Sequence, residues 1–338
     1  MKGMIFVANE KMWALYAHLG TTIDKDDKSD KLQFEDEMWD YILDESEKAG
    51  INTIVLAVSD GIVFESHPEI ASDTAWKSSR VREEVAKCKR KNISLIPVLN
   101  FASPHDAWLG EYHRKLCTPE YYEVCRDLIK EAYELFDHPE YIHIGMDEED
   151  AKHVKSHELA VYRQGELYWH DLRFYIDCVK ETGAKPWMWS CALFDHPEEY
   201  KKHIGADEAV LSPWYYNAFN KEHWTPISSR DVYVTYYNEG EYASMGLKYV
   251  EEDPFLVNFR KVALPLMKEG YKYIPCASVC NRCDWNTHDL VEYFKNNAHD
   301  DGVLGYITAP WKATTKENKP FFDESIKFLK EAKEKFYK

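Results

Sequence analysis

Short apolar runs alternate with longer amphipathic segments along the chain, and this alternation is the strongest constraint on its fold. Strand-like runs occur at Met4–Ala8, Thr53–Val58, Ser94–Leu99, Tyr141–Gly145, Pro186–Ser190, Ala209–Ser212, Tyr273–Ser278 and Gly302–Thr308. Helical spacing covers Glu35–Ala49, Ser79–Lys91, Pro119–Phe136, Glu166–Glu181, Pro254–Glu269 and Phe321–Lys338. A strand followed by a helix, repeated about eight times, is typical of a parallel sheet closed into a barrel. We therefore predict an α/β fold, a (β/α)8 TIM barrel, with residues 1–338 in a single domain.

The other common parallel architecture is the doubly wound open sheet, and the sequence argues against it. Such a sheet that binds a dinucleotide has a Gly-rich phosphate turn after its first strand. No G-x-G-x-x-G motif occurs there. The tyrosine-rich stretch 225–252 is too long for a plain strand-to-helix connection, so we expect an insertion at this point, near the sixth strand.

Charge and composition exclude several classes of partner. The chain has 42 Lys+Arg and 59 Asp+Glu, a formal net charge of −17, whereas a protein that binds nucleic acid needs a basic surface. No apolar run approaches the roughly 18 residues of a membrane helix. We therefore expect neither nucleic acid nor a membrane as partner. Oligomeric state has no signal in the sequence.

The cysteines and the N-terminus bear on the compartment. Eight cysteines in a chain of this size are typical of free thiols rather than a disulfide framework. The N-terminal apolar run is too short for a secretion signal. These features predict a cytoplasmic protein. A leader upstream of the sequence as given would instead make it secreted or periplasmic.

The richest group of polar residues follows the fourth predicted strand. Four acids stand in a row there, Asp147-Glu148-Glu149-Asp150. Barrel enzymes place their chemistry where strands end. Crowded carboxylates raise one another's pKa, and a raised pKa suits a general acid. The alternative is an acidic loop that caps the next helix, where carboxylates are also favoured. Position alone leaves both interpretations open.

Aromatic and amide side chains follow several other predicted strands. The candidate ligand-contacting residues at these strand ends are Asn100, His105, Trp189, Trp214, Tyr215, Asn217 and Trp311. Indole groups from three strands, facing one carboxylate cluster, would form an apolar box with hydrogen-bonding tips, about the size of a sugar. A single Trp is more often part of the core than of a ligand site, but three at strand ends favour a carbohydrate as the ligand.

The strand-end motifs resemble a known family. His143-Ile144-Gly145-Met146-Asp147-Glu148 resembles the His-x-Gly-Gly-Asp-Glu signature of the family 20 glycoside hydrolases, the β-N-acetylhexosaminidases, with Met146 at the second glycine. Three further segments are similar to family motifs in the same order: Ser103-Pro104-His105 to a Pro-Gly-His loop, Trp214-Tyr215-Tyr216-Asn217 to a Trp-Tyr-Leu-Asp motif, and Gly302–Trp311 to the last strand with its Trp. The likeness extends over most of the chain.

This resemblance implies a glycoside hydrolase that removes terminal N-acetylhexosamine (GlcNAc or GalNAc) by substrate-assisted retaining catalysis, with no metal or other cofactor. Glu148 would be the general acid and base. Asp147 would hold the acetamido N–H and stabilise the positive charge that develops. Tyr215 would orient the acetamido oxygen. The resemblance implies substrate-binding roles for Trp189, Trp214 and Trp311, which would wall the sugar, and for Asn100, His105 and Asn217.

The sequence also departs from the family pattern. The family carries an Arg near the end of its first strand, and residues 9–13 offer none. Lys312 follows the last-strand Trp where a Glu is usual, and Asn217 replaces an Asp. These departures imply altered recognition of the sugar hydroxyls in a divergent member.

Two other functions stay open. One is a catalytically silent carbohydrate-binding barrel. The other is a metal-dependent sugar isomerase or deacetylase, although convergent His/Asp pairs are scarce at the other strand ends. Cys276, Cys280 and Cys283 could supply thiolates to zinc, but their spacing lacks the paired Cys-x-x-Cys form and favours buried thiols.

Overall fold

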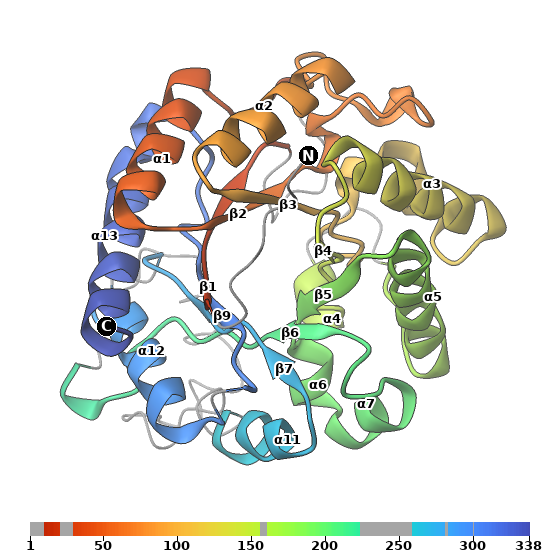
Figure 1. Ribbon diagram of the computed structural model, residues 1–338. Helices are drawn as coiled ribbons and strands as arrows, with labels where there is room; N and C mark the ends of the chain where they lie inside the picture. The colour runs from red at the N-terminus through yellow and green to blue at the C-terminus, as the bar shows by residue number, and fades with distance from the viewer. Residues whose placement is uncertain (1–9, 21–29, 156–160, 224–258, 281–282, 300) are drawn as a thin grey trace.

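Parallel strands form the centre of the protein, and helices surround them. A computed structural model describes residues 10–20, 30–155, 161–223, 259–280, 283–299 and 301–338. Within these residues one parallel sheet contains the strands β1 (Met12–His18), β2 (Thr53–Ala57), β3 (Ser94–Val98), β4 (Tyr141–His143), β5 (Lys185–Trp189), β6 (Val210–Ser212), β7 (Lys272–Tyr273), β8 (Cys276–Ala277) and β9 (Gly305–Thr308). The helices form a ring outside the strands (Figure 1).

Most helices connect one strand to the next. Those described are α1 (Asp36–Ala49), α2 (Ser78–Arg90), α3 (Pro119–Leu135), α4 (Ala151–Val154), α5 (Glu166–Thr182), α6 (Cys191–Asp195), α7 (Pro197–His203), α11 (Leu264–Lys268), α12 (Asn286–Asn297) and α13 (Lys319–Phe336). A π-helical turn at Phe259–Ala263 leads into α11, and short 3-10 turns lie in the connections. The last helix, α13, packs against α1 and α12 (Figure 1).

The sheet closes into a barrel through its seventh strand. The strand order runs β7-β6-β5-β4-β3-β2-β1-β9-β8, so the two ends of the order are β7 and β8, which are neighbours in sequence. Isolated bridges link the two short strands to both sides: Cys276 of β8 pairs with Trp214, which follows β6, and Tyr273 of β7 pairs with Val303, which precedes β9. Pro275, which has no N–H to donate, lies between the halves. β7 and β8 are therefore one interrupted barrel strand, and the described residues form a barrel of eight strands.

Side chains alternate between the barrel interior and the layer under the helices. On β1, Ala14 and Tyr16 belong to the interior cluster, whereas Trp13, Leu15 and Ala17 pack in the outer core. This period of two is the ordinary geometry of a strand. It determines which strand-end residues face the barrel mouth.

The structure confirms the predicted barrel and corrects some of its elements. The first barrel strand is Met12–His18, which the sequence patterns did not predict; the expected strand at Met4–Ala8 lies outside the described residues. The predicted strand Tyr273–Ser278 is divided into β7 and β8. The expected insertion at 225–252 lies outside the described residues, as does the beginning of the predicted helix Pro254–Glu269.

Two further observations concern the exclusions drawn from the sequence. Among the described residues, no helix is both long and apolar enough to cross a bilayer.

Cys88, Cys125 and Cys178 are buried thiols on α2, α3 and α5, where burial raises their pKa. Buried, protonated thiols of this kind behave as small apolar side chains.

Candidate functional site

The chain turns sharply where β4 ends, at the mouth of the barrel. Gly145, Met146 and Glu148 all have positive φ, at 72°, 62° and 56°. A Cβ on Gly145 would lie 1.9 Å from Asn100 Oδ1, so only glycine fits the close approach of the two loops. Left-handed backbone at two non-glycine residues is strained, and such strain is concentrated at functional sites.

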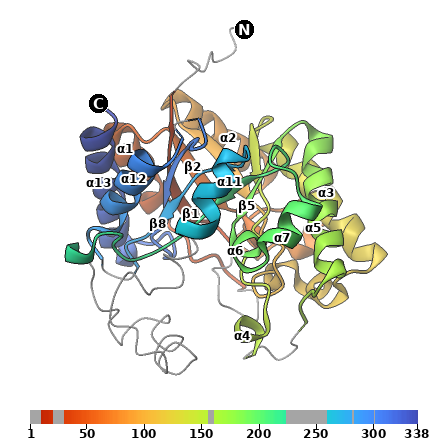
Figure 2. The same ribbon diagram turned by 90° about the horizontal axis from the view of Figure 1, so that it is seen from below.

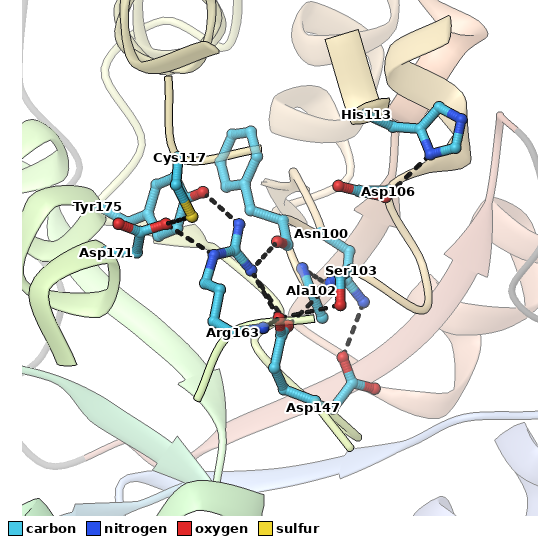
Figure 3. Close-up of polar contacts among 12 residues, drawn as sticks. Asn100, Ala102, Ser103, Asp106, His113, Cys117, Asp147, Arg163, Asp171 and Tyr175 are labelled. Atoms are coloured by element: carbon cyan, nitrogen blue, oxygen red, sulfur yellow. Dashed lines mark hydrogen bonds and ion pairs between the residues drawn. The ribbon is translucent and has the colours of Figure 1, made fainter. Parts of the chain in front are cut away.

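This turn brings two carboxylates together with an amide and two imidazoles. Asn100 Nδ2 donates to Asp147 Oδ1 at 2.9 Å (Figure 3). His105 Nε2 lies 3.1 Å from Glu148 Oε2 and 3.5 Å from Asp147 Oδ2. His153 Nε2, on α4, lies 3.3 Å from Glu148 Oε1. Four residues that the sequence analysis singled out therefore meet at one place, and a fifth, His153, joins them.

The two carboxyl groups have pKa values shifted in opposite directions. Burial raises the pKa of Asp147, and the charge of Glu148 adds to this against the opposing effects of His105 and Asn100. Burial also acts to raise the pKa of Glu148, but hydrogen bonds from His105 and His153 outweigh it and lower the pKa. The hydrogen bonds of His153 to Asp150 and Glu148 likewise overcome its burial and raise its pKa to about 10. A raised pKa thus occurs at Asp147, with burial and not crowding as its main cause, whereas the imidazoles lower the pKa of Glu148, the residue expected to act as the general acid.

The third acid of the run lies in a buried ion network. Arg163 Nη1 lies 3.1 Å from both carboxylate oxygens of Glu149, and its Nε donates to Asp171 at 2.7 Å (Figure 3). The same guanidinium donates to the Tyr175 hydroxyl at 2.8 Å. Glu149 also accepts from the N–H and hydroxyl of Ser103, at 2.8 and 2.9 Å. This network joins the loops after β3 and β4 to α5 and holds the backbone beside Glu148.

The fourth acid caps the next helix. Asp150 Oδ1 accepts from the backbone N–H of His153 at 3.2 Å, and its Oδ2 lies 2.9 Å from the ring Nδ1 of the same residue. The capping role considered for the whole acidic run therefore applies to Asp150, whereas Asp147 and Glu148 meet the side chains of the neighbouring loop.

Aromatic rings fill the interior of the barrel near this end. The ring of Trp311 lies 5.6 Å from Trp189, 5.0 Å from Tyr16 and 6.2 Å from Tyr216, between centroids. Trp214 stacks on Tyr216 at 5.1 Å. Trp311 has a φ of 50°, a strained value for a bulky residue. Trp189 thus belongs to the interior cluster, and Trp214 and Trp311 pack against it; that the three indoles form the wall of a sugar site stays a prediction.

Tyr215 and Asn217 lie differently. The Tyr215 ring packs 5.1 Å from Phe219, and Tyr215 belongs to the outer core rather than the interior cluster. Asn217 Oδ1 accepts from the backbone N–H of Ala218 at 2.8 Å. Buried Asn286 donates to the carbonyls of Tyr215 and Asn217, both at 2.7 Å, and so fixes this loop. The substrate roles of Tyr215 and Asn217 stay predictions.

The sequence analysis missed several residues of the site. His153 follows Glu148 by five positions on a helix too short to recognise, and Arg163 is an isolated cation in the same connection. Tyr16 was missed because the first strand was placed upstream. Tyr216 is in the interior although its neighbour Tyr215 was chosen; counting alternate residues from Trp214 would have indicated it.

Two groups of side chains in the described part of the chain have the spacing to hold a metal ion. His105, Asp147 and Glu148 offer ligand atoms within 4.8 Å of one another. Glu166, Glu199 and His203 form a second, more exposed group. Neither group includes a cysteine. One imidazole and two carboxylates suit a divalent cation, so the first group fits both acid-base chemistry and metal binding.

Comparisons with known proteins agree with this architecture. No protein-family model and no curated protein matches the sequence. Among solved structures, the chain is similar to the β-N-acetylhexosaminidase of Bacteroides fragilis NCTC 9343, with a TM-score of 0.60 and 12% identity over 95% of this chain and 65% of that one. For the GH20 β-N-acetylhexosaminidase of Streptomyces coelicolor A3(2), the TM-score is 0.61 and the identity 12%, over 95% of this chain and 64% of that one. For a GH20 exo-β-N-acetylglucosaminidase of Vibrio harveyi, the TM-score is 0.60 and the identity 13%, over 95% of this chain and 54% of that one.

The likeness shows the fold. The chain has the barrel architecture of family 20 glycoside hydrolases, in agreement with the motifs that resemble this family. It spans 54% to 65% of the length of these three proteins.

Proposed function

We propose that the chain is a glycoside hydrolase that removes terminal N-acetylhexosamine by substrate-assisted retaining catalysis. The observation that carries the proposal is the adjacent pair Asp147 and Glu148 at the end of β4. Asn100 and His105 hold the pair, and three tryptophans line the barrel interior near the same end. A sugar is bound by apolar walls with a few directed polar groups, and this arrangement offers both.

Each of the two acids has a distinct task in this mechanism. The acetamido oxygen of the substrate attacks the anomeric carbon, so the protein needs no nucleophile of its own. Asp147, oriented by Asn100, accepts a hydrogen bond from the acetamido N–H and, when ionised, stabilises the positive charge of the cyclic intermediate. Because burial raises the pKa of Asp147, this role requires that its proton be lost, and His105, 3.5 Å away, is placed to take it. Glu148 gives a proton to the leaving oxygen and then takes one from the water that opens the intermediate. Because His105 and His153 lower the pKa of Glu148, this carboxylate must first take up a proton, and the two adjacent imidazoles are the groups that can supply it. His105 contacts both carboxylates, so a proton can be shared at this point.

The positioning of the acetamido oxygen is assigned to a phenol from the loop after β6. The resemblance implies Tyr215 for this role. Tyr216 is the tyrosine of this loop that packs in the interior cluster, 6.2 Å from Trp311. The two phenols are therefore to be compared directly, by single hydroxyl deletions.

A metal-dependent reaction is the second candidate, because His105, Asp147 and Glu148 also have metal-ligand spacing. A hydrolase of the proposed kind keeps its turnover after exhaustive treatment with a chelator. A metal-dependent deacetylase or isomerase loses activity and regains it when a divalent cation is added.

The decisive experiment is the hydrolysis of aryl glycosides by Glu148→Gln. We expect the wild type to release 4-nitrophenol from the N-acetyl-β-glucosaminide or galactosaminide, but not from the β-glucoside without the acetamido group. E148Q should reduce this turnover by at least about a hundredfold, as expected when a general acid is removed. The matched control is Glu140→Gln, an exposed acid before β4 that pairs with Lys185 at 2.8 Å. Equal turnover of E148Q and E140Q would remove Glu148 from the mechanism.

A further inference from the structure

His18 is a buried imidazole without a hydrogen-bond partner at the end of the first barrel strand. It is 2% exposed, and among the described residues neither of its ring nitrogens has a hydrogen-bond partner. Burial lowers its pKa to about 4, so the ring is neutral near pH 7. Leaving buried polar atoms unsatisfied is costly in stability, and a binding function is one explanation for keeping them.

The direction of the His18 ring follows from strand geometry. His18 follows Ala14 and Tyr16 at alternate positions of β1, and both of these face the barrel interior. Its ring lies 5.1 Å from Tyr16 and 6.1 Å from Trp311, between centroids. The Thr314 hydroxyl donates to the His18 carbonyl at 2.7 Å and fixes the strand end. The imidazole is therefore held in place and turned inward.

Trp311 adds a second polar atom of the same kind. Its indole Nε1 is buried and has no hydrogen-bond partner among the described residues. Its backbone, at a φ of 50°, is strained. Trp311 follows β9, which pairs with β1, so the two unsatisfied side chains come from neighbouring strands.

These atoms are continuous with the candidate active site. Trp311 contacts Trp189, and Trp189 lies 4.7 Å from His143 on β4, the strand that leads to Asp147. The negative charge of Asp147 also helps, after burial, to raise the pKa of Tyr16. β1 and β9 lie across the barrel from β4 (Figure 1). Contacts between rings therefore connect His18 and Trp311 to the strand that leads to the carboxylates.

The chemistry of these groups selects among ligands. A neutral imidazole offers one donor and one acceptor, and an indole offers one donor. A hydroxyl group both donates and accepts, whereas sulfate, phosphate or carboxylate only accepts. Lys312, the cation next to Trp311, has its ammonium 4.9 Å from the centroid of the Phe321 ring on α13. The subsite therefore matches free hydroxyls better than an anionic substituent.

We propose that His18 and the indole N–H of Trp311 form a neutral subsite that hydrogen-bonds free hydroxyl groups of the bound sugar and disfavours sugars with an anionic group at that position. The proposal names the substrate class of the same site and rests on the proposed function only in taking the ligand to be an amino sugar.

The test is a binding cycle that changes both protein and ligand. Calorimetric titrations use N-acetylglucosamine, its 3-, 4- and 6-deoxy analogues and its 3-, 4- and 6-sulfates, none of which carries a cleavable aglycone. The proteins are the wild type, His18→Leu and His18→Asn, which keeps a donor and an acceptor. His288→Leu is the control, since His288 lies outside the barrel on α12 near Glu331 of α13.

We expect the wild type to bind one deoxy analogue about tenfold more weakly than the parent sugar. H18L should bind the parent about tenfold more weakly but bind that analogue as the wild type does, and H18N should recover part of the difference. Sulfate at the same position should weaken wild-type binding at least as much as loss of the hydroxyl, and H288L should behave as the wild type. Ligand-free H18L should melt at a higher temperature, because an unsatisfied imidazole is removed.

Several outcomes would overturn the subsite: equal discrimination by H18L and the wild type, tight binding of all the sulfated sugars, or no binding of any of these sugars by the wild type. A lower melting temperature of H18L with unchanged binding would assign His18 a structural role. Failure of the hydrolase proposal is separate. If the wild type binds the sugars in the expected pattern but releases no 4-nitrophenol, the subsite proposal is supported and the hydrolase proposal is refuted. If the wild type hydrolyses the aryl glycosides and its binding does not depend on His18, the hydrolase proposal is supported and the subsite proposal is refuted.

Discussion

Replacing Arg163 with methionine tests the buried network under the active-site loops. Methionine is also unbranched but has no charge, so the substitution leaves Glu149 and Asp171 without their cation. The side chains of these two acids are 4% and 0% exposed. Removing one partner of a buried pair costs about 3–5 kcal/mol, because the remaining charge stays buried. For 338 residues, an unfolding entropy of about 2.1 cal/mol/K per residue is about 0.7 kcal/mol/K. A loss of about 4 kcal/mol therefore corresponds to a melting temperature about 6 °C lower.

The matched control is Arg126→Met, which removes an ion pair of similar length at the surface. Arg126 lies 2.7 Å from Glu181, but the two side chains are 37% and 52% exposed, so solvent screens the pair. We expect less than about 1 kcal/mol for this change. Urea denaturation followed by tryptophan fluorescence, together with thermal melting, measures both variants. Equal destabilisation by R163M and R126M would refute the reasoning that burial determines the strength of the Arg163 network.

Three further predictions concern the pH dependence, the turn and the phenols. The pKa of His18 is about 4 in the folded protein and about 6.5 in the unfolded chain, so the unfolded chain binds the proton more readily as the pH falls. The free energy of unfolding should therefore fall by about 3 kcal/mol between pH 6.5 and pH 4. Melting curves should show this loss in the wild type and a smaller one in H18L. Gly145→Ala should lower stability by at least about 1 kcal/mol and reduce turnover, because alanine at a φ of 72° is strained and its Cβ would meet Asn100; a variant as stable and active as the wild type would contradict this. Tyr216→Phe should lower kcat for aryl N-acetylglucosaminides more than Tyr215→Phe if the interior phenol orients the acetamido group, and the reverse order would restore the role to Tyr215.

The fold was predictable because barrel strands and helices leave strong local patterns. Buried runs such as Thr53–Ala57 and Leu95–Val98 lie within the predicted ranges. The first strand was missed because Met12–His18 mixes aromatic, small and imidazole side chains instead of a β-branched run. Barrel closure depends on pairing between residues far apart in sequence. The proline at position 275 does not reveal that β7 pairs with β6 whereas β8 pairs with β9.

Within the site, motifs identified the residues that touch each other through short loops. Asn100 and His105 follow β3, and Asp147 and Glu148 follow β4, so adjacency of parallel strands brought them together. Arg163 could not be found in this way. Its partners lie on two loops and α5, and its importance depends on burial, which an isolated cation in a sequence does not reveal.

Each carboxylate of the acidic run has polar partners, and two imidazoles are shared: His105 contacts Asp147 and Glu148, and His153 contacts Glu148 and Asp150. Four like charges in sequence would repel one another if they shared one environment. The left-handed turns at Met146 and Glu148 send successive side chains in different directions. Asp147 meets an amide, Glu148 meets two imidazoles, and Glu149 meets a guanidinium. The opposite pKa shifts of Asp147 and Glu148 therefore follow from their unequal partners and not from distance, because the charge of Glu148 still raises the pKa of Asp147 and His105 contacts both carboxylates.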